Sequence, residues 1–169
     1  LRDEQMIKDL AKNDLIILNL DLWRNTPDAI DLLLAENPDA KLLINLQISQ
    51  VDATWKEPSE GNVFQHGLYA GIDDSWCVRN TEGEIMFYGS EQFPLLNLTG
   101  FSPVDDLGRT WSDWFVEYVS WVYVQPELAG KVHGVFLDVA IDEMSWYKKW
   151  GEWDVDNNGI ADNRLMLDN

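Results

Sequence analysis

Four near-continuous apolar runs constrain the fold of this chain more than any other feature of its sequence. They read DLIILNLDLW at 14–23, KLLINLQIS at 41–49, PLLNLTG at 94–100 and GVFLDVA at 134–140. Runs that stay apolar until their last residues are typical of strands buried on both faces, as in parallel sheets. We therefore predict four buried strands.

A helix pattern connects the first two runs. Thr26 stands where a capping residue is expected, Pro27 follows in the first helical position, and the stretch PDAIDLLLAENP has acids in its first turn. Pro38 ends this helix. The strand, helix and strand together form a βαβ unit, whose crossover is right-handed almost without exception.

The rest of the chain alternates in the same way. Further elements are predicted as helices at 1–10, 62–69 and 109–125 and as a small hairpin at 76–89. The aromatic residues of the helix within 109–125 are more typical of a core than of a ligand platform. The hairpin turns through Glu82 and Gly83.

This order of elements predicts one α/β domain with a parallel sheet over residues 1–169. A complete (β/α)8 barrel needs about 250 residues, so the chain is either a small open α/β sheet or the first half of a TIM barrel. A half barrel has two open sheet edges, which tend to pair or aggregate. A second chain, or a missing C-terminal half, would then complete it.

The formal charge of −18 excludes two classes of partner. A chain this acidic repels nucleic acid and anionic membrane surfaces, and no apolar run approaches the roughly 20 residues of a membrane helix. The single cysteine, Cys77, excludes an internal disulfide.

Several segments together resemble a known group of proteins. DLIILN at 14–19, DDSWCVRNTEGE at 73–84, LNLT at 96–99, GVFLD at 134–138 and DVDNNGIAD at 154–162 occur in this order. The chain resembles hypothetical glycosyl hydrolase family fifteen and the related endo-α-1,4-polygalactosaminidase families. This resemblance implies a (β/α)8 barrel, of which the chain is the N-terminal half, and hydrolysis of a glycosidic bond in a polysaccharide.

Asp138 is the strongest catalytic candidate, because it ends the apolar run GVFL. In parallel barrels the active site lies at the carboxyl ends of the strands. Glycoside hydrolysis needs two carboxyl groups, about 5–5.5 Å apart for retention and wider for inversion. The second group could be Asp142, Glu143 or an acid in a later strand. The structural alternative for Asp138 is that it caps the following helix or loop. For Asp142 and Glu143 it is that they are ordinary acids in the first turn of a helix.

Other residues at strand ends and in loops are candidates for binding sugar. A carboxylate accepts hydrogen bonds from hydroxyls and an indole stacks on a sugar ring, so Asp21 and Trp23 suit this role. Gln47 and Asn97 end the second and third runs and could bind hydroxyls, and Trp76 could be a platform. For each tryptophan the alternative is packing in the core.

The segment D-x-D-x-N-G-x-x-D is a candidate calcium loop. Its oxygen ligands would be the side chains or carbonyl of Asp154, Asp156, Asn158, Ile160 and Asp162. Leu165 replaces the bidentate glutamate of an EF-hand, so the loop is more similar to the short calcium loops of extracellular proteins. We therefore expect a structural Ca²⁺ ion and a secreted or cell-surface location. The alternative is an acidic turn without an ion.

Three function classes follow from these residues. The first is a carbohydrate-active enzyme or its catalytic half. The second is a non-catalytic carbohydrate-binding or calcium-stabilised structural module, and the third is an unrelated small α/β domain.

Overall fold

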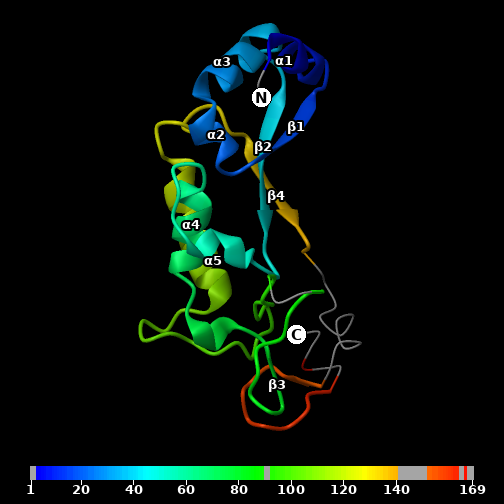
Figure 1. Ribbon diagram of the computed structural model, residues 1–169, viewed down its shortest axis with the longest axis vertical. Coiled ribbons are helices and arrows are strands. Elements are labelled where there is room, and N and C mark those ends of the chain that lie inside the picture. The colour runs from blue at the N-terminus through cyan, green and yellow to red at the C-terminus, as the bar shows by residue number, and fades with distance from the viewer. Residues whose placement is uncertain (1–2, 90–91, 141–151, 164–165, 167–169) are drawn as a thin grey trace.

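A parallel sheet of three strands organises the structure, which is a computed structural model describing residues 3–89, 92–140, 152–163 and 166. The strands are β1 (Leu15–Asn19), β2 (Lys41–Gln47) and β4 (Gly134–Asp138), in the order β1-β2-β4. The chain therefore has the α/β fold with a parallel sheet that its sequence predicts, and the sheet is compatible with part of a β/α barrel (Figure 1).

Helices form close to four predicted positions, and further short helices form at 22–25, 53–56 and 74–76, where the sequence predicts none. The α-helices are α1 (Glu4–Leu10), α2 (Leu22–Asn25), α3 (Pro27–Glu36), α4 (Val63–Ala70) and α5 (Trp111–Tyr123), and two 3-10 helices are η1 (Ala53–Lys56) and η2 (Asp74–Trp76). Pro27 is in the first turn of α3, as predicted. None of the helices in the described residues is long and apolar enough to cross a membrane.

The prediction of a third parallel strand at 94–100 is wrong. Residues of this segment form isolated antiparallel bridges, in which Leu95 pairs with Gln50 and Leu96 with Cys77. β2 instead pairs directly with β4 along its whole second half, from Leu43 opposite Gly134 to Gln47 opposite Asp138. The apolar run at 94–100 is buried as expected, but its hydrogen bonds go to loops and not to the sheet.

The prediction that the strands are buried on both faces is also wrong. In β1 exposed and buried residues alternate. In β2 buried residues alternate with residues that are half-buried or, at Lys41, exposed. Leu42, Ile44 and other residues of one face belong to the main core with the helices. On the other face Ile17 and Phe136 are 41% and 40% exposed, because no helix or strand among the described residues covers them.

The predicted hairpin is present and belongs to a second, smaller core. The Met86 N–H donates to the Val78 carbonyl at 2.8 Å, and Gly83 turns the chain with a φ of 82°. β3 (Arg79–Asn80), within this hairpin, pairs antiparallel with β5 (Trp153–Asp154). Trp153 is fully buried there, against Val78 and other apolar residues.

Gly67 within α4 and Gly71 directly after it allow α5 to approach closely. A Cβ on Gly67 would lie 2.3 Å from the Tyr118 hydroxyl oxygen, and one on Gly71 would lie 2.0 Å from the Trp114 ring. The same Tyr118 hydroxyl donates to the Phe64 carbonyl at 2.7 Å. Glycine at these positions therefore sets the spacing of the two helices, because any larger residue would overlap the aromatic rings of α5.

We predict that Gly71→Ala destabilises the protein, although the φ of −90° at this C-cap position suits alanine. The added methyl must displace the Trp114 ring, and overpacking of this kind costs about 1–3 kcal/mol. Urea unfolding would measure the loss. Gly61→Ala is the matched control, since its Cβ would meet nothing closer than 3.8 Å. Equal stability of the two variants would contradict this account of the helix spacing.

Candidate functional site

Asp138 ends β4 and lies in register with Gln47 at the end of β2. Side chains of directly paired residues in a parallel sheet point to the same face, so this carboxylate and this amide are neighbours. One oxygen of Asp138 accepts the N–H of Val139 at 2.9 Å. The carboxylate is half-buried and therefore remains within reach of solvent.

The backbone after Asp138 is strained and firmly held. Val139 has a φ of 54°, which a β-branched residue rarely adopts. Its carbonyl accepts from the Ser49 hydroxyl at 2.7 Å, and the carbonyl of Asp138 accepts from the Ile48 N–H at 3.3 Å. Such strain occurs where surrounding contacts over-determine a conformation, and it clusters at functional sites. Here the Ser49 and Ile48 hydrogen bonds hold the backbone of Asp138 and Val139 against the chain after β2.

Amide side chains surround the carboxyl end of the sheet. Asn19 and Asn45 are paired across β1 and β2, and the Gln50 amide donates to the Gln47 side-chain oxygen at 3.2 Å. Within the described chain, the side-chain oxygens of Asn45 and Gln50 are buried without a hydrogen-bond partner. Buried acceptors of this kind are costly, and a hydroxyl donor could satisfy them if the neighbouring side chains moved.

Sequence reasoning missed Asn19, Asn45 and Gln50 as parts of this cluster. The sequence pattern could have identified two of them, because Asn19 and Asn45 are polar residues within largely apolar strands. Gln50 carried no such signal. Its place depends on the turn that the chain makes after β2, where it bridges to Leu95.

Asp21 has a different position from the one expected of a sugar ligand. It is 3% exposed, and its two oxygens accept the N–H groups of Phe64 at 2.9 Å and Gln65 at 2.8 Å. These are first-turn amides of α4, which have no partner within the helix. Burial raises the pKa of Asp21, and the two hydrogen bonds partly offset this. The carboxylate thus caps α4 from the end of β1.

The two tryptophans expected as sugar platforms lie in the core. Trp23 and Trp76 are fully buried, and the Trp76 indole donates to the Arg109 carbonyl at 3.1 Å. Asn97 is 1% exposed and donates to the Val155 carbonyl at 2.7 Å. In this structure all three side chains pack or bridge within the protein, whereas Gln47 remains half-buried beside Asp138. The proposed catalytic acids Asp142 and Glu143 lie outside the described residues.

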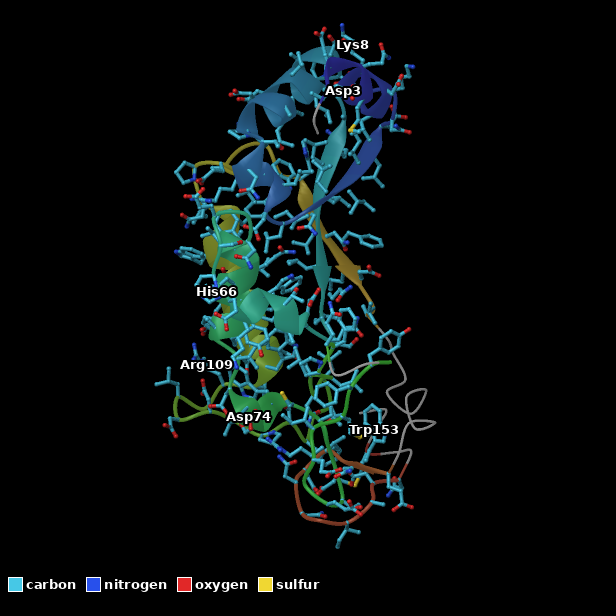
Figure 2. All side chains as sticks on the ribbon, viewed as in Figure 1. Asp3, Lys8, His66, Asp74, Arg109 and Trp153 are labelled. Carbon is cyan, nitrogen blue, oxygen red and sulfur yellow. The ribbon has the colours of Figure 1, made fainter. Side chains whose placement is uncertain are left out.

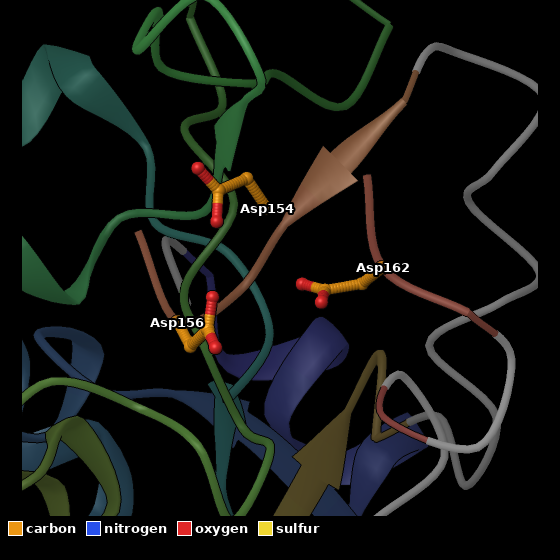
Figure 3. Close-up of side chains that lie close together, drawn as sticks. All are labelled: Asp154, Asp156 and Asp162. Atoms are coloured by element: carbon orange, nitrogen blue, oxygen red, sulfur yellow. The ribbon is translucent and has the colours of Figure 1, made fainter. Parts of the chain in front are cut away.

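Three of the predicted calcium ligands converge. Asp154, Asp156 and Asp162 each offer a carboxylate oxygen, and these oxygens all lie within 4.8 Å of one another (Figure 3). Asp154 and Asp162 are buried. Carboxylates this close repel one another unless a proton or a cation lies between them, so the cluster could hold a metal ion. Oxygen ligands suit Ca²⁺ better than zinc.

The loop around these acids is shaped by its own hydrogen bonds. The two oxygens of Asp154 accept the N–H groups of Asn158 at 2.8 Å and Gly159 at 2.7 Å. The Asn158 side-chain oxygen accepts the Ile160 N–H at 2.8 Å. The other two expected ligands, Asn158 and the Ile160 carbonyl, are thus in the same loop as the three carboxylates.

The acidic loop is anchored to the rest of the molecule. Asp154 pairs with Arg79 across β5 and β3, and an oxygen of Asp162 accepts the Val155 N–H. Burial raises the pKa of Asp162; the Val155 hydrogen bond opposes this, and the nearby charges of Asp156 and Asp154 raise the pKa further. An ion bound here would therefore connect the loop to the hairpin.

Comparison with protein-family models and with curated proteins finds no match for this chain.

We predict that Asp21→Ala destabilises the protein by about 2 kcal/mol, because two buried N–H groups of α4 lose their acceptor. Urea unfolding would measure this loss. The control is Asp3→Ala, which removes one exposed cap bond to Met6 and should cost less than about 1 kcal/mol. A loss for Asp21→Ala no larger than that of Asp3→Ala would show that the buried cap matters little.

We predict that Ca²⁺ binds to the acidic loop and stabilises the fold. At free Ca²⁺ about 100-fold above Kd the gain should be about 2.7 kcal/mol, a Tm rise of about 5–10 °C. Calorimetry after chelator treatment would give the affinity, which Asp156→Asn should lower about tenfold. Asp39→Asn, on an exposed turn, should leave it unchanged. If calcium produces neither heat of binding nor a rise in Tm, the loop is an acidic turn that binds no Ca²⁺.

Proposed function

We propose that this chain is the N-terminal part of a glycoside hydrolase that acts on a polysaccharide. The observation that carries the proposal is the half-buried carboxylate of Asp138 at the carboxyl end of a parallel strand, held by a strained backbone. Amide side chains gather beside it, and amides and carboxylates are the groups that bind sugar hydroxyls. The resemblance to the glycosidase families supports the same reading.

In this mechanism Asp138 is the nucleophile or the general acid and base. As nucleophile it attacks the anomeric carbon, the glycosidic bond breaks, and a second carboxylic acid protonates the leaving oxygen. Water then hydrolyses the glycosyl-enzyme bond. Asp142, Glu143 or an acid of a later strand is the proposed second group. Gln47, which is half-buried beside Asp138, would bind a hydroxyl of the ring that occupies the site.

The barrel itself is part of the proposal. One face of the sheet is open, with Leu15, Ile17 and Phe136 exposed, and β1 and β4 have free edges within the described residues. Apolar residues on an open sheet face favour burial against further strands. We propose that additional strands, from a longer chain or from a second chain, cover this face and close the barrel around Asp138.

The acidic loop supports a second candidate, a non-catalytic carbohydrate-binding or calcium-stabilised module. The cluster of three carboxylates favours a structural ion, and such loops suit a secreted or cell-surface protein. In both readings the ion would hold the hairpin and the loops beyond the carboxyl ends of the strands. The two readings differ in whether Asp138 supports turnover.

We predict that Asp138→Asn abolishes hydrolysis of the active glycan and keeps the fold, because the change is nearly isosteric. Loss of a nucleophile or proton donor should lower kcat/KM by about 10³-fold or more. Activity is measured on a panel of polysaccharides with reducing-end detection, in the protein that includes the strands completing the barrel, and circular dichroism monitors the fold. Asp39→Asn is the charge-matched control. Equal turnover by the wild type and Asp138→Asn would remove Asp138 from the mechanism, and glycan binding without turnover would favour the second candidate.

A further inference from the structure

A cavity of about 260 Å³ lies apart from the groups discussed so far, between the hairpin, the chain after β2 and the end of α4. Its walls are mainly apolar and include Val51, Ile72, Ile85, Phe87 and Pro94. Tyr69 and Asp74 add a phenol and a carboxylate. Figure 2 shows Asp74, the first residue of η2, in the part of the molecule beyond the carboxyl ends of β2 and β4.

The walls of this cavity are fixed by the backbone. The Ala53 N–H donates to the Gln92 carbonyl at 2.7 Å, which holds the chain after β2 against the segment that contains Pro94. Phe87 forms an antiparallel bridge with Pro94. A pocket that is already formed needs little ordering when a ligand enters, and this favours binding of small molecules.

The polar groups of the cavity select the kind of ligand. Asp74 forms an ion pair with Arg79 at 2.5 Å, yet its side chain stays 78% exposed and can accept further hydrogen bonds. The Tyr69 hydroxyl can donate or accept. Burial raises the pKa of the Cys77 thiol to about 11, so that the thiol is neutral and acts as an apolar wall. The carboxylate and the net charge of −18 disfavour anions.

The size of the cavity limits the ligand further. Pockets for drug-sized molecules run from about 300 to 1,000 Å³, so about 260 Å³ suits a single ring. A neighbouring cavity of about 420 Å³ shares Ile85 and Phe87 with it and is otherwise lined mostly by polar residues, among them Asn80 and Glu152. A chain of linked rings could therefore continue across the hairpin from one cavity into the other.

We propose that the cavity at Tyr69 and Asp74 is a binding subsite for one neutral sugar ring of a glycan chain. The ring packs its apolar face against Ile85 and Phe87, and its hydroxyls donate to the Asp74 carboxylate and bond with the Tyr69 hydroxyl. The next unit occupies the neighbouring cavity. The choice of a glycan as ligand rests on the proposed function. The presence of the cavity and its polar groups is independent of that function.

Isoleucine methyl NMR on the whole chain tests this subsite directly. Ile72 and Ile85 line the cavity, whereas Ile7, Ile16 and Ile30 belong to the main core and serve as internal controls. Ile72→Val and Ile85→Val assign the two reporter signals. The probes are the methyl glycosides of glucose, galactose and N-acetylglucosamine, with cyclohexanol as a ring of the same size that carries one hydroxyl.

We expect at least one glycoside to shift the Ile72 and Ile85 signals in a saturable way, to leave the core signals in place, and to bind more tightly than cyclohexanol. Tyr69→Phe and Asp74→Asn should each weaken that binding roughly tenfold, and Asp39→Asn should not change it. The proposal is overturned if no glycoside shifts the reporters, if cyclohexanol binds equally well, or if the core signals shift equally.

The outcome separates this inference from the catalytic proposal. Asp138→Asn should retain glycoside binding at the reporters, because Asp138 does not line the cavity. Glycoside binding at the cavity, in a protein whose barrel is complete but which hydrolyses no glycan, would support the subsite and contradict the proposed enzyme. Hydrolysis with a KM unchanged by Tyr69→Phe and Asp74→Asn would support the proposed enzyme and contradict the proposed subsite.

Discussion

The pairing of β2 with β1 on one edge and β4 on the other is the constraint on which the rest of the structure depends. β2 contributes Leu42, Ile44 and Leu46 to the main core, all of them almost fully buried. Because all three strands run parallel, their carboxyl ends meet at one end of the sheet. This places Asp138, the last residue of β4, beside Gln47, the last residue of β2.

Parallel pairing also requires a long connection from β2 to β4, and specific contacts hold that connection in place. The Asp21 carboxylate binds the first turn of α4, while Gly67 and Gly71 let the aromatic side chains of α5 come close. Such contacts depend on shape and on buried hydrogen bonds as much as on hydrophobic area. The connection also supplies the hairpin, which carries both the anchor of the acidic loop and the walls of the further cavity.

Much of the site could be predicted, but several roles could not. Asp138 was recognisable because an acid after an apolar strand has no part in the strand's own packing. The carboxylates of the acidic loop were recognisable from their alternation over a few residues. Asp21 obeyed the same strand-end rule as Asp138, yet it caps a helix, because its role depends on where α4 begins in space. The buried positions of Trp23 and Trp76 likewise follow from packing partners far along the chain.

The sequence by itself determined the α/β class, the positions of α1, α3, α4 and α5, the hairpin and the acidic loop. Each of these follows from local signals: hydrophobic periodicity, proline and glycine positions, and alternating acids. Only the tertiary structure decided that β4, and not the run at 94–100, pairs with β2. It also decided that one sheet face is open and that Asp21 caps α4. These outcomes depend on contacts between residues distant in sequence. No local pattern determines which of several apolar runs becomes a strand of the sheet.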